Sequence, residues 1–245
     1  MADPDRPSQQ PISEQVLAQQ RISQEPLPQQ PATIEDMAQA ASSSVEEGTD
    51  IRARVRDLTL HALRDRRFEP DAIRDVLRAV TEGIRRGAEQ RPHGMRQALS
   101  DALTGLDDAM MKTAEAASLA LRELTAQGKE FSDHELKQVL DNVKKMEEDF
   151  LQTARHAADR GSVIVRKEML DILSHLRLTG TDTGAQVVAT LNEFAGRMTA
   201  ISLESAKIGF EAALDFSARF ALLASGILAG LAETLHNQAA DRDKK

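Results

Sequence analysis

Histidines and carboxylates are the side chains of this chain that could bind a metal or move a proton. Glu233 and His236 form a Glu-x-x-His unit, which carboxylate-bridged di-iron bundles use twice, with two further inward-facing glutamates. This chain has one such unit, so we expect no di-iron site. The stretch SDHEL at 132–136 has no second histidine four residues after the first, as a zincin motif requires.

The sequence also lacks the residues that nucleophilic catalysis or phosphate binding would require. The sequence has no cysteine, which excludes thiolate nucleophiles, disulfides and Cys-based zinc sites. The stretch GTDTG at 180–184 is too short for a phosphate-binding loop and contains no lysine. Asp171 and His175 stand four residues apart, a spacing more often found in a solvated helix pair than in an acid–base device. We therefore predict no catalytic residues, no cofactor and no metal, and a protein that is not an enzyme.

Residues 1–49 differ in character from the rest of the chain. They contain six of the eight prolines, and no apolar period persists through them, so we predict a disordered tail that acts as a flexible, solubilising arm. Two related stretches leave an alternative open, a pair of docking motifs: QQPISEQVLAQQ at 9–20 and QQPATIEDMAQA at 29–40. In the second, Thr33 and Asp36 resemble a capping box.

The segment 50–92 reads as an Arg-rich helical hairpin. Asp50 can cap a first helix, Pro70 opens a second, and the stretch around Pro92 is a break. Residues 50–96 hold twelve arginines against eight acidic residues. These arginines either pair with carboxylates of the same molecule or bind nucleic acid or anionic lipid. The excess charge is small and Phe68 is the one aromatic residue there, so we expect the first.

From 93 onward, apolar residues recur at alternating spacings of four and three. This period is typical of helices packed side by side in coiled-coil fashion, and short breaks favour antiparallel neighbours. We predict an all-α fold, an elongated antiparallel bundle of long amphipathic helices at 93–180 and an apolar C-terminal helix at 181–240. A second period crosses Gly161, which leaves open whether 161–182 is continuous helix or a bend. The clearest period runs through Leu99, Leu103, Leu106, Met110, Thr113, Ala117, Ala120 and Leu124.

Residues 220–232, FALLASGILAGLA, are thirteen positions without a charge. As a helix they span about 20 Å, less than the ~30 Å hydrocarbon core of a bilayer, so we expect no transmembrane span. Gly226 and Gly230 can let helices approach closely, with the segment as the hub of the bundle or of a homo-oligomer. Alternatively, a Phe-bearing face lies on lipid or storage polymer. The residues predicted to make this contact are Phe210, Phe216, Phe220, Leu223, Gly226, Ile227, Leu228, Gly230 and Leu231.

Four stretches of the sequence are distinctive: DIRARVRDLTLHALRDRRFEPDAIRDVLRAVTEGI, FSDHELKQVLDNVKKMEEDFL, LTGTDTG and LASGILAGLAETL. They resemble a bacterial all-helical family known only as a domain of unknown function. The resemblance covers residues 50–238 and implies an all-helical domain, with no activity or functional residues to carry over. The Ala-rich, low-aromatic amphipathic helices are also similar in pattern to phasins, which coat polyhydroxyalkanoate granules.

These observations combine into one functional prediction with two alternatives. We predict a non-enzymatic protein that coats an apolar surface, a lipid boundary or a phasin-like granule. The first alternative is a homo-oligomeric scaffold that packs through the C-terminal GxxxG helix, and the second is nucleic-acid binding by the Arg block. The N-terminus has no apolar core behind basic residues, so we expect no secretory signal and a cytoplasmic location.

Overall fold

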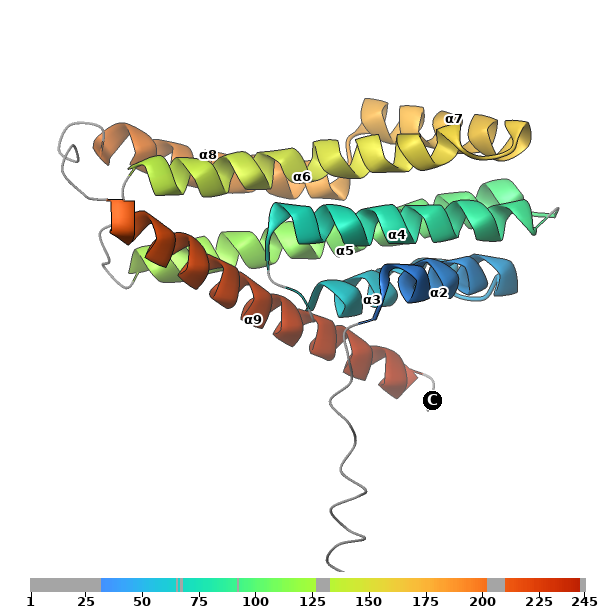
Figure 1. Cartoon of the computed structure of the whole chain (residues 1–245), viewed down its shortest axis with the longest axis horizontal. Helices are drawn as coiled ribbons and strands as arrows, with labels where there is room; N and C mark the ends of the chain where they lie inside the picture. The colour runs from blue at the N-terminus through green and yellow to red at the C-terminus, as the bar shows by residue number, and fades with distance from the viewer. Residues whose placement is uncertain are drawn as a thin grey trace, which may run out of the picture. The chain divides into compact units, whose positions relative to one another are not determined.

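The structure is a computed structural model that describes residues 32–64, 66, 68–91, 93–126, 133–201 and 210–242. This part of the chain is helical and contains no strand, which confirms the all-α prediction (Figure 1). Residues from Ala32 onward form one compact unit, which contains every helix that the structure describes. The helices are α2 (Ile34–Glu47), α3 (Ile51–Arg64), α4 (Pro70–Glu89), α5 (Met95–Ala126), α6 (Asp133–Asp159), α7 (Val163–Thr179), α8 (Asp182–Ile201) and α9 (Phe210–Arg242).

Helix α2 corrects the predicted N-terminal tail, because residues 34–47 are ordered. Thr33 and Asp36 form the capping box: Thr33 Oγ accepts from the Asp36 N–H (3.1 Å), and an Asp36 carboxylate oxygen accepts from the Thr33 N–H (3.0 Å). Met37, Ala41 and Val45 recur every four residues and are fully buried. The sequence prediction missed this stripe because Gln and Ser surround it. Residues 1–31 of the predicted tail lie outside the described residues.

Helix α2 lies against α4 at very short range, and two glycines of α4 make that possible. A Cβ atom at Gly83 would stand 2.1 Å from the Ala38 carbonyl oxygen. A Cβ atom at Gly87 would stand 2.4 Å from the Ser42 carbonyl oxygen. Because these neighbours are backbone atoms, only glycine fits at the two positions without moving α2.

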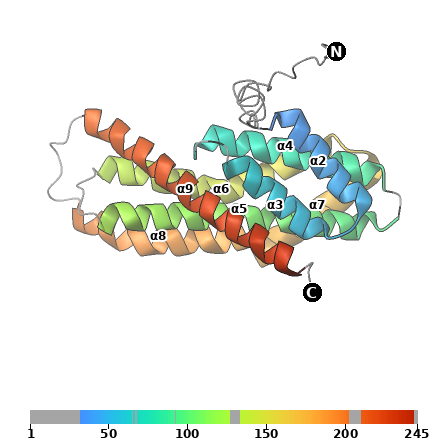
Figure 2. The same cartoon turned by 90° about the horizontal axis from the view of Figure 1, so that it is seen from below.

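Helix α5 occupies the centre of the bundle. Its six consecutive residues from Gly105 to Met110 are all buried, and six residues cover every direction around a helix axis. It contacts α3, α8 and α9 most extensively (Figure 2). The apolar period predicted between Leu99 and Leu124 is buried along its whole length, so that prediction is confirmed. Its many alanines let several neighbouring helices approach at once.

Helices α4, α5 and α6 run antiparallel to one another in turn along the length of the bundle (Figure 1). The stretch 161–182 is not one continuous helix: α6 ends at Asp159, and Ser162 caps α7, which folds back onto α6. A second break at Gly180, with φ +87°, separates α7 from α8. The seven-residue period read across Gly161 therefore belongs to two helices that lie side by side.

Candidate functional site

Helix α9, which contains the predicted contact residues, lies across α3 and α5 and also touches α6 (Figure 2). Among its described side chains, those of residues 218–235, the buried ones are Phe220, Ala224 and Leu228, spaced four residues apart. Five further apolar residues are half-buried and pack against the same core: Leu223, Ile227, Leu231, Ala232 and Leu235. Most of the large apolar side chains predicted to meet a partner thus face the protein's own bundle.

The two glycines predicted to meet a partner lie on the opposite, outward face of α9. Gly226 and Gly230 are exposed, and a Cβ atom at either position would meet nothing within 4 Å. Leu222, one turn before Gly226, is 72% exposed. Between Arg219 and Glu233 the outward face therefore carries no charge, and it has no side-chain bulk at the two glycines. Phe210 and Phe216 are the other two predicted contact residues, and their side chains are not among those that the structure describes.

Helix α9 is not the hub of the bundle, one of the roles its composition suggested. The window Ala218–Leu235 has the length and apolar composition of a membrane-crossing helix, a test that the core helix of a soluble protein also passes. Only 17% of that window is buried, however. The hub is α5, and α9 is an outer helix with one covered face. A largely apolar helix in that position has surface left to cover.

A short loop between α3 and α4 holds α9 in place. Ser225 Oγ accepts a hydrogen bond from the Phe68 backbone N–H (3.1 Å) and donates one to the Arg66 carbonyl oxygen (3.4 Å). The rings of Phe68 and Phe220 meet edge to face, with centroids 5.6 Å apart. Sequence reasoning identified Phe220 but missed Phe68 and Ser225. No local pattern marks a contact across more than 150 residues.

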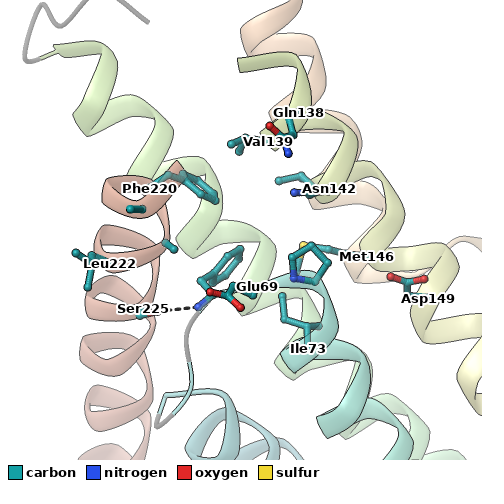
Figure 3. A pocket seen from close by; sticks show the side chains of 15 residues that line it. Glu69, Ile73, Gln138, Val139, Asn142, Met146, Asp149, Phe220, Leu222 and Ser225 are labelled. Carbon is teal, nitrogen blue, oxygen red and sulfur yellow. Dashed lines mark hydrogen bonds between the residues drawn. The ribbon is translucent and has the colours of Figure 1, made fainter. Parts of the chain in front are cut away.

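Beside this attachment the structure contains a cavity of about 450 Å³ (Figure 3). The start of α4, the first half of α6 and the near side of α9 enclose it. Its walls are mainly apolar and include Phe68, Ile73, Val143, Met146 and Phe220. Polar side chains of α6 stand along one edge.

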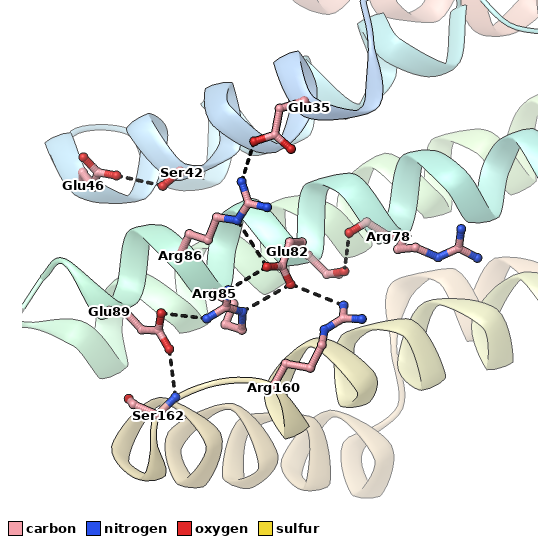
Figure 4. Close-up of polar contacts among 11 residues, drawn as sticks. Glu35, Ser42, Glu46, Arg78, Glu82, Arg85, Arg86, Glu89, Arg160 and Ser162 are labelled. Carbon is pink, nitrogen blue, oxygen red and sulfur yellow. Dashed lines mark hydrogen bonds and ion pairs between the residues drawn. The ribbon is translucent and has the colours of Figure 1, made fainter.

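Most of the described arginines of the Arg block pair with carboxylates of the same molecule, as the sequence analysis expected (Figure 4). Glu82 accepts from Arg85 (2.6 Å) and Arg86 (3.2 Å), and Arg160 lies 3.3 Å away. These guanidinium groups, Arg85 first, lower the pKa of the Glu82 carboxyl below its usual value. Arg86 also reaches Glu35 on α2 (2.6 Å), so the network joins α2, α4 and the end of α6.

Helices α5 and α8 are joined by a buried carboxylate. Asp107 accepts hydrogen bonds from the backbone N–H of Asp182 (2.8 Å), and from the backbone N–H (3.1 Å) and hydroxyl (2.6 Å) of Thr183. It therefore satisfies free N–H groups at the start of α8. Burial raises the pKa of Asp107, and the bonds from Thr183 and Asp182 oppose that rise. The next residue, Asp108, accepts both of its bonds from Arg52, at 2.6 and 2.8 Å.

The residues examined for catalysis do not form a site in the part of the chain that the structure describes. No group of three or more histidine, aspartate or glutamate side chains comes together there as a metal centre would require. Asp171 lies 3.6 Å from Arg96. Thr181 and Thr183 of the GTDTG stretch bond to Glu147 and Asp107 instead of facing an open anion site.

A family profile matches residues 24–237 of this chain, and its description is a family of unknown function (DUF6781). The chain belongs to this family. The match begins before α2, so the family's domain is longer at its N-terminal end than the expected 50–238. No curated protein and no solved structure matches the chain.

Proposed function

We propose that this protein is a non-enzymatic helical interaction protein that associates with a second copy of itself through the outward face of α9. The observation that carries the proposal is the position of Gly226 and Gly230. Both glycines are on an exposed helix face, and open space lies where their side chains would be. Glycines four residues apart let two helix backbones approach closely, and here that approach has no partner within the described chain.

The same face suits pairing between identical copies. Leu222 projects from it and Gly226 and Gly230 leave it flat, so a leucine of one copy can rest on the glycines of the other. A two-fold axis would place the same residues on both sides of the contact, the commonest arrangement in homodimers. One helix face supplies fewer residues than the ~20–30 per side of a standard interface. We therefore expect a weak dimer that depends on protein concentration.

The test is a dilution series followed by analytical ultracentrifugation or light scattering. The variant Gly226→Leu should shift the series toward monomer, because its side chain fills the space the partner helix needs. Lys145→Leu, which adds the same side chain at an exposed position of α6, should leave the masses unchanged. A wild-type protein that stays monomeric throughout the series would refute the proposal. Equal masses for Gly226→Leu and wild type would also refute it.

The second candidate function is the predicted coating of an apolar surface, as phasins do. The observation that favours it is the apolar window Ala218–Leu235, most of which is not buried. In the described arrangement Phe220, Leu228 and their neighbours face inward, so coating would require α9 to turn or leave the bundle. Flotation with lipid vesicles tests this candidate. Binding that Leu222→Glu and Gly226→Leu both leave intact would indicate such a rearrangement, and no flotation would remove the candidate.

Nucleic-acid binding by the Arg block is the weakest of the three functions. The guanidinium groups of Arg52, Arg85 and Arg86 form ion pairs with carboxylates of the same molecule. Binding to phosphates would have to break these pairs.

A further inference from the structure

The cavity beside the attachment of α9 is large enough for a small molecule and has an apolar floor. Its volume of about 450 Å³ lies within the ~300–1,000 Å³ common for ligand pockets. Ile73 of α4, together with Val139, Val143 and Met146 of α6, forms the floor, and all four side chains are buried. Phe220 closes the side that belongs to α9 (Figure 3). Binding of an apolar molecule on this floor is favourable because it removes apolar surface from water.

The charged groups of the cavity are already engaged within the protein. Asp149 of α6 pairs with Arg74, whose Nε lies 3.2 Å from an Asp149 carboxylate oxygen. Glu69, the residue before α4, also interacts with another group of the protein. Among the described residues of the lining there is no lysine, arginine or histidine. A charged ligand would lose hydration here without gaining a free counter-ion, so the cavity favours an uncharged molecule.

Two neutral amides supply hydrogen bonds at one edge of the cavity. Gln138 and Asn142 stand one turn apart on α6 (Figure 3). Each amide can donate through its nitrogen and accept through its oxygen. In the part of the chain that the structure describes, neither amide has a hydrogen-bond partner. The hydroxyl of Ser225, by contrast, is used by its two bonds to the loop between α3 and α4.

We propose that this cavity binds an uncharged amphiphile, an alkyl chain or ring system that ends in a hydroxyl or amide group. The apolar body lies on Ile73, Val143 and Met146, and the polar end faces Gln138 and Asn142. The proposal goes beyond self-association and does not require it. Leu222, however, belongs both to the rim of the cavity and to the outward face of α9, so the test is made on the monomer.

Ligand-observed NMR titrations of the full chain with three ligands of equal chain length test this assignment. The ligands are octanol, octylamine and octanoate, each below its aggregation concentration. We expect octanol to bind most tightly. Both ions should bind about tenfold more weakly or worse, since each gives up hydration for a site without a free counter-ion. Either ion binding as tightly as octanol would overturn the assignment of an uncharged ligand, and no binding by any of the three would overturn the site.

The same titrations keep ligand binding separate from self-association. They use protein concentrations at which the dilution series finds the monomer, so that a second copy does not cover Leu222. A protein that stays monomeric at every concentration would refute the proposed dimer and leave the octanol result unchanged. A protein that dimerises but binds no octanol would refute the cavity site alone.

Two variants locate the binding. Ala221→Phe places a ring into the cavity from α9 and should abolish octanol binding. Asn142→Ala removes one amide from the polar edge and should weaken octanol about two- to tenfold, the range of a single hydrogen bond.

Asn192→Ala is the matched control, because it removes the same amide from an exposed position of α8 outside the cavity lining. It should bind octanol as wild type does. Equal octanol affinities for Asn142→Ala and Asn192→Ala would refute the placement of the polar end. Circular dichroism checks that Ala221→Phe is folded. If it is not, the comparison between Asn142→Ala and Asn192→Ala decides where octanol binds.

Discussion

Replacing single glycines by alanine at Gly83 and at Gly226 should have opposite effects on stability. Both residues lie inside helices, where alanine is favoured over glycine by about 1 kcal/mol. At Gly226 the new methyl group meets nothing within 4 Å, so the full gain should remain. At Gly83 the methyl carbon would stand 2.1 Å from the Ala38 carbonyl oxygen and 2.7 Å from the Ala41 methyl.

The size of the second effect follows from that contact. Two non-bonded atoms attract best at about 3.5–4.0 Å, so the methyl group at Gly83 forces α2 to move by more than 1 Å. Overpacking of a tight core costs about 1–3 kcal/mol, and the contact with backbone places Gly83→Ala near the upper end. After the ~1 kcal/mol gain in helix propensity, the net loss is about 2 kcal/mol. Gly83→Ala and Gly226→Ala should therefore differ by about 3 kcal/mol.

Thermal unfolding by circular dichroism measures the difference. For a chain of this length about 1 kcal/mol corresponds to 2–4 °C in Tm, so the two melting temperatures should lie roughly 6–12 °C apart. The experiment is run at low protein concentration, so that loss of the proposed α9 dimer does not mask the gain at Gly226. Gly105→Ala is a second test in the same direction, since its methyl group would stand 2.2 Å from the Arg52 carbonyl oxygen. If Gly83→Ala raises Tm as much as Gly226→Ala does, the close contact between α2 and α4 is wrong.

Three further predictions concern the polar contacts. Asp107→Ala leaves the first N–H groups of α8, including that of Asp182, without an acceptor, and should lower the free energy of unfolding by about 1–2 kcal/mol in urea titrations; no change would contradict the capping role. The folded-state pKa of Glu82 is depressed, so its ion pairs stabilise the fold above the unfolded-state pKa and lose that effect as the pH falls through the folded-state value. The stability difference between wild type and Glu82→Gln should accordingly be full above pH ~4.5 and vanish in more acidic solution, and a difference independent of pH would count against it. Ser225→Ala removes both hydrogen bonds to the loop at Phe68, and should speed amide hydrogen exchange in α9 while α5 stays protected; equal rates in α9 before and after would show that the loop does not hold the helix.

The apolar residues of α9 show which part of the candidate site could be predicted from the sequence. The apolar residues Phe220, Leu228 and Leu231 were selected because the segment has no charge, and they do make contacts. Their partner is the protein's own bundle. The sequence could not predict this, because the spacing of apolar residues indicates that a helix face is buried but not which surface buries it. The Arg block is the opposite case. Its pairing within the molecule could be predicted, since carboxylates are abundant nearby, but the particular partners, such as Asp108 for Arg52, depend on the fold.

The sequence by itself determined the helical class, the buried face of α5 and the break near Gly180. These features follow from local rules, the repeat of apolar residues around a helix and the backbone freedom of glycine. Only the tertiary structure showed which of two identically spaced glycine pairs packs against another helix. Gly83 and Gly87 are spaced as Gly226 and Gly230 are, yet another helix lies against the first pair and open space against the second. Burial depends on what lies opposite a residue, and that neighbour comes from a distant part of the chain.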